Sequence, residues 1–443
     1  MLLPRLPSEA TCGSMDSGPP RAPPGGPPRP TDIPHSCAMR NVLFAAPFPL
    51  ETTFRFVRAA ASLPGVRLLG VVAQRPEGAD ARLFADIVTV SDPFDPRQLV
   101  EAAHLLQRRH GPLSRVTGIL EPLMVPLAHV REAFDLPGLG VDTAELFRDK
   151  GRMKDALRQA GLPCARHRVL RAPEDATSFA DEVGFPLVVK PIAGMGSKAT
   201  WRIRSADELR AAVGALRVSP ERPAIAEEFL QGREYSFETI TIDGVPRFTS
   251  FSRYFPTPLE VLENPWIQWS VLHPRAVDGP EFDDARQLGL DALKALGLDT
   301  AFTHMEWFRR DDGSLAIGEI AARPPGAQIV PGNNFVHDAD FHRAWANAVI
   351  LDRFDTATER KYAVAVAFLR GIGQGRVARI HGREAAHAAV GHLVVESRLP
   401  RIGAQRADTY EGDGFVILRH PDTDTVKAAL KTVLETIRIE YAR

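Results

Sequence analysis

Residues 303–326 read THMEWFRRDDGSLAIGEIAARPPG, and this stretch decides the fold. Polar and apolar residues alternate over Ala301–Phe308, turn-forming residues follow at 311–314, and a second apolar run extends from Leu315 to Ala322. Two such runs joined by a short turn are typical of a β-hairpin. The stretch is therefore predicted to form two antiparallel strands.

Two glutamates interrupt the apolar runs of this hairpin. Glu306 lies in the first strand and Glu319 in the second, and the turn between them can bring their side chains together. Burial of a carboxylate is costly unless a cation or hydrogen bonds compensate it. A divalent ion would compensate both, and because Mg²⁺ usually combines one or two carboxylates with phosphate and water oxygens, the pair also indicates a nucleotide. Arg323, which follows the second strand, could brace a phosphoryl oxygen.

In a simpler interpretation, the same hairpin has no catalytic or metal-binding role. Glu306 and Glu319 would then be solvent-facing strand residues, with Arg323 as their salt-bridge partner. Hairpins with two glutamates are common, so the hairpin alone leaves both interpretations open.

The composition is that of a globular protein with no special partner. The chain has 443 residues, which suffices for two to four domains, with 44% hydrophobic and 25% charged residues and a formal net charge of −1. This charge provides no basic field, so neither nucleic acid nor an anionic membrane surface is predicted as a partner. Three scattered cysteines, Cys12, Cys37 and Cys164, and no apolar run long enough to span a membrane favour a soluble, cytoplasmic protein.

The first 38 residues differ from the rest of the chain. They hold ten of the 37 prolines and no apolar core of a signal peptide. We expect residues 1–38 to be a disordered leader. Met1, Met15 and Met39 are all candidate start residues, because Met39 directly precedes the first predicted strand.

Strand and helix patterns alternate from residue 39 onward, which predicts a small parallel α/β sheet. The predicted strands are Asn41–Ala46, Val66–Ala73, Asp86–Val90 and Arg115–Leu120, and the predicted helices are Pro96–Arg109 and Pro122–Phe134. No GxGxxG follows the first strand, which argues against a dinucleotide site of the Rossmann kind.

A lysine-bearing segment follows this region. Thr143–Gly161 is predicted as one helix that ends at a glycine, and Phe185–Pro191 as a strand that contains Lys190. The glycine-rich loop 193–198 comes next, and its backbone N–H groups could close on phosphate oxygens beside that lysine. Taken alone, such a loop is more often a plain hairpin turn.

The remaining elements are assigned from the same patterns. Antiparallel hairpins are predicted from Ala224–Leu230, Tyr235–Ile242 and Val245–Phe251, a helix at Pro280–Leu296, a loop at Gln328–Phe335 and a helix at Asp338–Ile350. Further strands are expected at Tyr362–Leu369, His392–Glu396 and Gly414–Arg419, before a final helix at Thr423–Tyr441 that is capped from Asp422.

Four separated pieces stand in one order along the chain: RDK at 148–150, PLVVKP at 186–191 with its glycine loop, EEFLQGRE at 227–234, and the two-glutamate hairpin with Arg323. Together they resemble the ATP-grasp superfamily, and most closely its carboxylate–amine ligases. The resemblance covers residues 140–330. It implies an α/β (α+β) fold with a Rossmann-like pre-grasp domain at 39–137, an ATP-grasp domain at 138–352 whose central lid part spans about 164–230, and an α+β subdomain at 353–443.

The resemblance also implies an ATP site. Lys150 and Lys190 would reach the phosphates, and Glu227 and Glu234 would meet the adenine amino group and the ribose hydroxyls. The loop and the adenine strand would contribute the remaining contacts, from Gly194, Gly196 and Ser197 to the phosphates and from the backbone of Glu228, Phe229 and Leu230 to the adenine edge.

Metal and catalytic roles follow from the same resemblance. Glu306 and Glu319 would bind Mg²⁺ or Mn²⁺, while Arg323 and Lys190 would be catalytic. Many family members carry Asn two residues after the second metal carboxylate, where this chain has Ala321. Water could replace that ligand, so one of two metal sites would be weakened.

The implied activity is ATP-dependent ligation. ATP would convert a carboxylate into an acyl phosphate, and an amine would displace the phosphate, giving ADP and phosphate. Small-molecule acids and amines would be the partners, and a homodimer is a candidate assembly. Two alternatives are a biotin-carboxylase-like enzyme, although the chain has no biotin-carrier lysine motif, and an ATP-binding protein that no longer turns over, although it retains the lysines, metal glutamates and arginine.

Several other side chains are candidates for the site. His304 could contact substrate or phosphate, or be a packed histidine, and Arg253 could bind a substrate carboxylate, or be structural. Lys154 is predicted to be solvated. Asn333 and Asn334 are expected in a turn, and Trp266 and Trp269 line an acceptor pocket or belong to the core.

Overall fold

The computed structural model describes residues 39–193, 199–264, 267–407 and 409–442. The predicted leader and Gly194, Gly196, Ser197 and Trp266 lie outside these ranges. Residues 39–443 pack as one compact unit, and the domain limits predicted within it stay predictions. No helix in the described part of the chain is both long enough and apolar enough to span a membrane.

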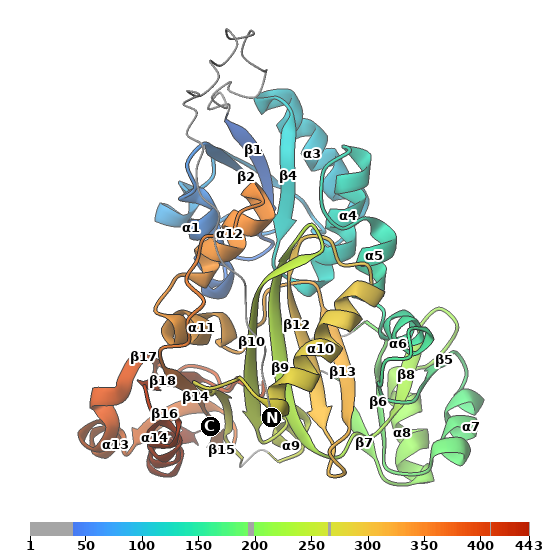
Figure 1. Cartoon of the computed structure of the whole chain (residues 1–443), viewed down its shortest axis with the longest axis vertical. Coiled ribbons are helices and arrows are strands. Elements are labelled where there is room, and N and C mark those ends of the chain that lie inside the picture. The colour runs from blue at the N-terminus through green and yellow to red at the C-terminus, as the bar shows by residue number, and fades with distance from the viewer. Residues whose placement is uncertain (1–38, 194–198, 265–266, 408, 443) are drawn as a thin grey trace, which may run out of the picture. The chain divides into compact units, whose positions relative to one another are not determined.

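The N-terminal part is the predicted parallel α/β sheet, with strand order β3-β2-β1-β4 (Figure 1). Its apolar strands are buried between helices on both faces. The strands are β1 Arg40–Ala45, β2 Val66–Val72, β3 Asp86–Thr89 and β4 Leu113–Gly118, and the helices are α1 Glu51–Ala61, α2 Gly78–Ala81, α3 Pro96–His110, the 3-10 turn η1 Glu121–Leu123 and α4 Met124–Ala133.

The single helix predicted over Thr143–Gly161 is wrong. The chain forms two helices instead, α5 Val141–Leu146 and α6 Lys150–Gln159. Asp149 separates them, since its backbone is extended and its carboxylate accepts hydrogen bonds from the N–H groups of Gly151 and Arg152, at 2.8 and 3.0 Å. This N-cap begins a new helix at Lys150.

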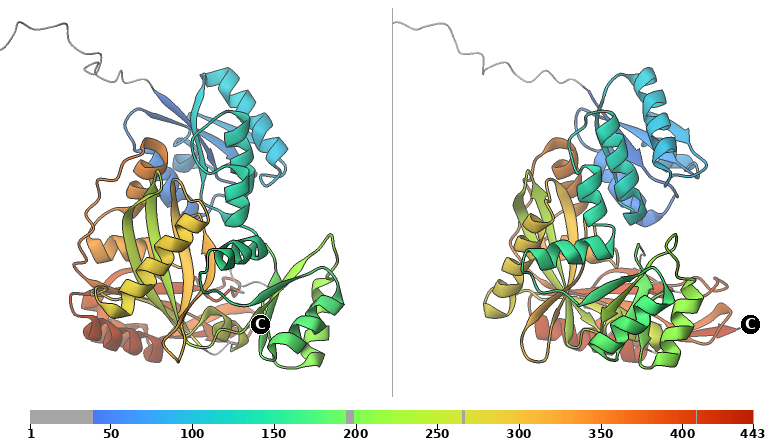
Figure 2. Two further views of the ribbon diagram at one scale, coloured as in Figure 1. Left: turned by 45° about the vertical axis from the view of Figure 1, so that its right-hand side comes forward. Right: turned by 90° about the vertical axis from the view of Figure 1, so that its right-hand side faces the viewer.

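A small antiparallel sheet follows, with strand order β5-β8-β6-β7, and two helices cover one face of it (Figure 2). The strands are β5 His167–Leu170, β6 Leu187–Pro191, β7 Trp201–Ile203 and β8 Ala224–Glu228, and the helices are α7 Pro173–Val183 and α8 Ala206–Leu216.

The predicted hairpin between Ala224–Leu230 and the next strand is also wrong, because β8 and β9 belong to different sheets. Gly232 lies between them with φ +143°, and a Cβ there would lie 2.3 Å from the Arg309 carbonyl oxygen. Only glycine fits this close approach, which redirects the chain onto the edge of the second sheet.

That second sheet has eight strands in the order β13-β12-β9-β10-β11-β14-β18-β17. Helix α10 covers one face of its first strands, while α12 packs between the opposite face and α1. The strands are β9 Arg233–Ile242, β10 Val245–Phe255, β11 Trp269–His273, β12 Ala301–Arg309, β13 Leu315–Ala321, β14 Ala363–Leu369, β17 Val394–Arg398 and β18 Gly414–His420, and the helices are α9 Pro258–Glu263, α10 Pro280–Ala295, α11 Ile329–His337 and α12 Phe341–Leu351.

Two C-terminal predictions are corrected. Gln328–Phe335 is not a loop but contributes most of α11, whose apolar residues are buried against the large sheet. The final helix ends early, at Thr436, and the chain continues as β19. Ile437 and Ile439 are buried at alternate positions, which is the strand period. This part contains β15 Gly371–Ile372, β16 Arg376–His381, α13 Arg383–Val390, η2 Gly391–Leu393, α14 Thr423–Thr436 and β19 Arg438–Ala442.

Candidate active site

The two-glutamate hairpin forms as predicted, and its two glutamates are directly opposite each other in the strand register. In the antiparallel register of β12 and β13, Glu306 pairs with Glu319, and Trp307 pairs with Ile317. The register shift leaves Gly318 as an extra residue, a β-bulge that re-aims the strand next to Glu319. Both glutamates line a cavity of about 750 Å³.

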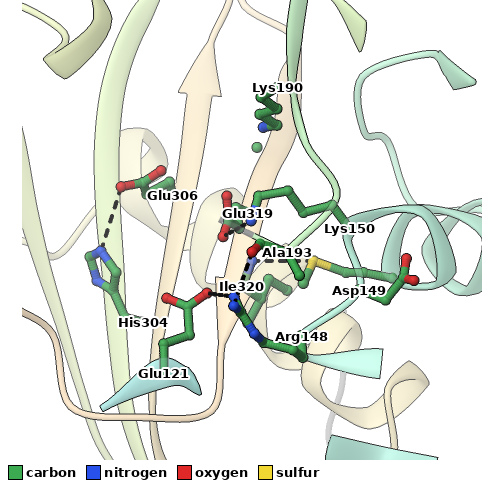
Figure 3. Close-up of polar contacts among 12 residues, drawn as sticks. Glu121, Arg148, Asp149, Lys150, Lys190, Ala193, His304, Glu306, Glu319 and Ile320 are labelled. Atoms are coloured by element: carbon green, nitrogen blue, oxygen red, sulfur yellow. Dashed lines mark hydrogen bonds and ion pairs between the residues drawn. The ribbon is translucent and has the colours of Figure 1, made fainter. Parts of the chain in front are cut away.

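The two carboxylates have different surroundings (Figure 3). Glu319 forms an ion pair with Lys150 of α6, with 2.8 Å between Oε1 and Nζ. Burial alone would raise the pKa of Glu319, but the charges of Lys150 and Lys190 lower it to about 2. The ion-pair partner of Glu306 among the described residues is His304, with 3.8 Å between Oε1 and the imidazole Nε2.

Glu234 adds a third carboxylate to this wall of the cavity. Burial and the neighbouring charge of Glu306 raise the pKa of Glu234 well above its ordinary value. Neither side chain is within ion-pair distance of a lysine or arginine in the described ranges, although the charge of Lys190 acts on both. Glutamates gathered on one cavity wall supply the oxygen ligands that a hard divalent ion such as Mg²⁺ prefers. No group of three or more His, Cys, Asp or Glu side chains in the described residues is arranged as a complete metal site, so other ligands would have to complete the coordination.

A second ion-pair group lies between the small sheet and α6. Lys190 of β6 is 2.9 Å from Glu227 Oε2, and Lys154 is 3.5 Å from Glu227 Oε1. Lys154 also donates a 2.7 Å hydrogen bond to the carbonyl oxygen of the bulge residue Gly318. The prediction that Lys154 is solvated is therefore wrong, because its side chain is 1% exposed. It falls on the buried face of α6, at i+4 from Lys150.

The predicted adenine strand reaches the same cavity. Glu227, Glu228, Phe229 and Leu230 all line it. The carboxylate of Glu228 pairs elsewhere, with Arg166 and Arg310 at 2.9 and 3.0 Å. Glu227 Oε1 is buried and has no hydrogen-bond partner among the residues described. This oxygen can still accept a hydrogen bond from a ligand.

Arg323 lines the cavity and is held by a residue that the sequence did not reveal. Glu121, from η1 in the N-terminal part, is 2.9 Å from Arg323. It is also 2.7 Å from Arg148 (Figure 3). Burial would lower the pKa of Arg323, but the charge and hydrogen bond of Glu121 raise it above its ordinary value. No local pattern marks Glu121, because its two partners come from distant parts of the chain.

The secondary candidates divide into cavity and core residues. His304 lines the cavity, but it is also packed, with Nδ1 3.0 Å from Glu238 and Nε2 3.3 Å from the Tyr254 hydroxyl. Arg253 does not line the cavity, and its guanidinium lies 4.2 Å from the centre of the Phe255 ring. The structure therefore gives Arg253 a packing role.

Trp269 is 1% exposed yet contributes to the cavity wall. Asn333 and Asn334 are not in a turn. They lie in α11, where Asn333 accepts a 2.8 Å hydrogen bond from the Ser250 hydroxyl and Asn334 accepts one from the N–H of Phe341.

The C-terminal part closes one side of the cavity. The sequence did not single out these wall residues, because they are spread over separate segments. They are Phe368 of β14, Arg398 of β17, and Tyr410 and Glu411 in the turn before β18. Tyr254 of β10, from the central part of the chain, also lines the cavity.

The hairpin, the two lysine-bearing elements and the small sheet define an ATP-grasp fold. Residues 155–327 match the model of the ATP-grasp domain family, so the chain contains an ATP-grasp domain. In its fold the chain is also similar to the crystal structure of an L-amino acid ligase from Bacillus licheniformis, with a TM-score of 0.74, 18% identity, and coverage of 91% of this chain and 99% of that one.

Curated relatives are similar in sequence. The chain is 27% identical over 251 residues to an L-arginine-specific L-amino acid ligase of Bacillus subtilis, covering 56% of this chain and 60% of the relative. It is 29% identical over 245 residues to an alanine–anticapsin ligase of Bacillus subtilis, covering 50% of each. The matches thus span only half to three-fifths of the length of these relatives.

Proposed function

We propose that this protein is an ATP-dependent ligase that activates a carboxylate and joins it to an amine, with amino acids as the substrate class. The observation that carries the proposal is the direct pairing of Glu306 with Glu319 at a cavity that Lys150, Lys190 and Arg323 also line. The similarity to an L-arginine-specific L-amino acid ligase and an alanine–anticapsin ligase supports the substrate class.

The nucleotide would bind between the small sheet and the hairpin. Glu227 Oε1, which has no hydrogen-bond donor among the described residues, would accept from the adenine amino group, and the backbone of 228–230 would meet the ring edge. Glu234, whose raised pKa reflects its burial, would contact the ribose. Lys150 and Lys190 would bind the phosphates as point charges.

The metal site would consist of Glu306 and Glu319, with phosphate and water oxygens as further ligands. A bound Mg²⁺ would neutralise charge on the phosphates. Ala321 lies in the cavity wall where an amide oxygen would be a further ligand, so we propose one well-held ion. Mn²⁺ as a substitute, a homodimeric assembly and a cytoplasmic location stay predictions.

The reaction needs two displacements. An oxygen of the substrate carboxylate attacks the γ-phosphorus of ATP, the bond to the ADP oxygen breaks, and an acyl phosphate forms. The neutral amine then attacks the carbonyl carbon, the C–O bond to phosphate breaks, and the amine loses a proton. Arg323, fixed by Glu121, supplies a guanidinium that can stabilise the phosphoryl oxygens and the tetrahedral oxyanion.

The experiment is ADP and phosphate release in the presence of Mg²⁺, with single amino acids and pairs of amino acids, followed by mass spectrometry of the product. A dipeptide or amide formed in a one-to-one ratio with ADP supports the proposal. ATP hydrolysis that no amino acid stimulates, or product formed only with bicarbonate, would contradict it.

A further inference from the structure

Glu411 is fixed in a tight turn against the end of β14. The Gly412 N–H donates to the Thr409 carbonyl at 3.2 Å, which closes the turn around Tyr410 and Glu411. Gly412 has φ +65°, and a Cβ there would lie 2.5 Å from the Leu369 carbonyl oxygen. Glycine is therefore required, and the turn cannot move away from β14 without losing this packing.

Asp413 ties the same turn to two other segments. Its N–H donates to the Leu369 carbonyl at 3.0 Å, and its carboxylate accepts from the Ala407 N–H at 2.7 Å and from the Tyr441 hydroxyl of β19. The side chain of Glu411, two residues before Asp413, is thus presented to the cavity from a turn that is fixed on both sides.

Glu411 forms no ion pair among the described residues, and the charge of Arg398 acts on its carboxylate only from beyond ion-pair distance. The side chain lines the cavity and is partly buried, and burial raises the pKa of its carboxyl. It accepts a hydrogen bond from the Ala327 N–H. Arg398, on the same wall, instead places its guanidinium 5.3 Å from the centre of the Phe415 ring.

Gln328 provides a second acceptor beside it. This residue follows Ala327, lines the cavity and is 7% exposed, and its Oε1 has no hydrogen-bond partner among the described residues. A buried acceptor without a donor is costly unless a ligand supplies one. The backbone of Gln328 is left-handed, with φ +55°, so this strained position is retained at the cavity wall.

We propose that Glu411 and Gln328 form a subsite for a positively charged nitrogen group, an ammonium or guanidinium, on one of the two substrates. The inference rests on the proposed ligase function and specifies the chemistry of its substrate. A carboxylate and an amide oxygen are both acceptors, and such a group offers both charge and N–H donors. The aromatic side chains of Tyr254, Tyr410 and Phe415 line the same cavity, and aromatic rings suit a cation better than an anion.

The test compares L-arginine with L-citrulline, which share their α-groups and shape but differ in side-chain charge. Binding of each to the full chain is measured by titration calorimetry without ATP, and kcat/KM by ADP release with ATP. We expect Glu411→Gln to weaken one or both ligands about 10- to 100-fold, as loss of a charged hydrogen bond does. The matched control is Glu384→Gln, at an exposed glutamate on α13.

The comparison of arginine with citrulline shows which group of the substrate carries the positive charge that Glu411 binds. A loss confined to arginine places a substrate side chain at Glu411, and an equal loss for arginine and citrulline places the α-ammonium there. Gln328→Asn withdraws the amide oxygen but tolerates a left-handed backbone, and it should weaken binding of the same ligand. This second variant keeps the test valid if Glu411→Gln lowers the melting temperature of the protein.

Wild-type binding of both ligands by Glu411→Gln and Gln328→Asn would overturn the subsite. Failure of the ligase proposal would give a different set of results. In that case no amino acid would stimulate ADP release by the wild type, while calorimetry would still show whether the subsite selects a cation.

Discussion

Lys154→Met removes the charge of a buried side chain while keeping its unbranched shape. The ammonium group of Lys154 lies 2.7 Å from the Gly318 carbonyl oxygen and 3.5 Å from Glu227 Oε1. It thereby connects α6, the adenine strand β8 and the bulge that precedes Glu319. The substitution should therefore affect both stability and the site.

The expected loss of stability depends on the groups that Lys154→Met leaves without a partner. Removal of one partner from a buried ion pair costs about 3–5 kcal/mol. Glu227 keeps Lys190 at 2.9 Å, which reduces this figure, but the Gly318 carbonyl loses its donor, which costs about 1–3 kcal/mol. Methionine recovers some apolar burial. We expect a loss of about 3 kcal/mol in the free energy of unfolding.

Urea unfolding followed by fluorescence measures this loss, with exposed Lys431→Met on α14 as the matched control. The double variant Lys154→Met/Glu227→Gln should lose less than the sum of the two single losses, because the single variants each leave a charge unbalanced. If Lys154→Met is as stable as the wild type, or if the losses add, the interior position of this lysine is refuted.

Three other substitutions test the site. Glu319→Gln should lower kcat by orders of magnitude, and a Mg²⁺ titration of ADP formation that gives wild-type turnover at limiting Mg²⁺ would contradict the metal assignment. Glu234→Gln should raise the KM for ATP and leave kcat nearly unchanged, so a pure kcat defect would show that the nucleotide is misplaced. Burial opposes the charge of His304, but hydrogen bonds and charge from Glu238 and Glu306 raise its pKa from 6.5 to about 9. The stability that this histidine contributes, up to about 3 kcal/mol, is present below pH 6.5 and is lost as the pH rises through 9, so His304→Gln should flatten the fall in the urea midpoint over that interval.

Local patterns were sufficient to predict the hairpin and its carboxylate pair. Strand alternation and turn chemistry are properties of neighbouring residues, and together they determine which side chains face one another across β12 and β13. The same holds for the parallel sheet, where apolar runs alternate with helical periods. The roles implied for Gly194, Gly196, Ser197 and Glu234 do not follow from these patterns and stay predictions.

Residues whose environment depends on distant segments were predicted less well. Lys154 lies on the buried face of α6 together with Lys150, Met153 and Leu157. This helical spacing favours burial of the side chain, whereas a lysine is ordinarily expected in solvent. Helix α11 was assigned as a loop because Pro331, Gly332 and two asparagines lower its intrinsic helix propensity, while burial against the large sheet stabilises it. Glu121 is 202 positions from Arg323, so only the fold relates them.

The ion pairs at the cavity also connect the parts of the fold. Lys150–Glu319 joins α6 to β13, Lys190–Glu227 joins β6 to β8, and Glu121–Arg323 joins η1 to the segment after β13. A substitution in any of these pairs therefore changes the packing of two elements as well as the chemistry.

Glu234 and Glu306 are different, since neither is within ion-pair distance of a lysine or arginine in the part of the chain that the structure describes. Neutralising Glu234 removes repulsion from the cavity wall, whereas neutralising Glu306 also removes part of the support of the charged His304. Glu234→Gln should therefore keep the stability of the wild type, and Glu306→Gln should lose the part of the His304 contribution that depends on Glu306. A loss of activity in Glu234→Gln can then be attributed to ligand binding, which makes this position the cleanest test of the site.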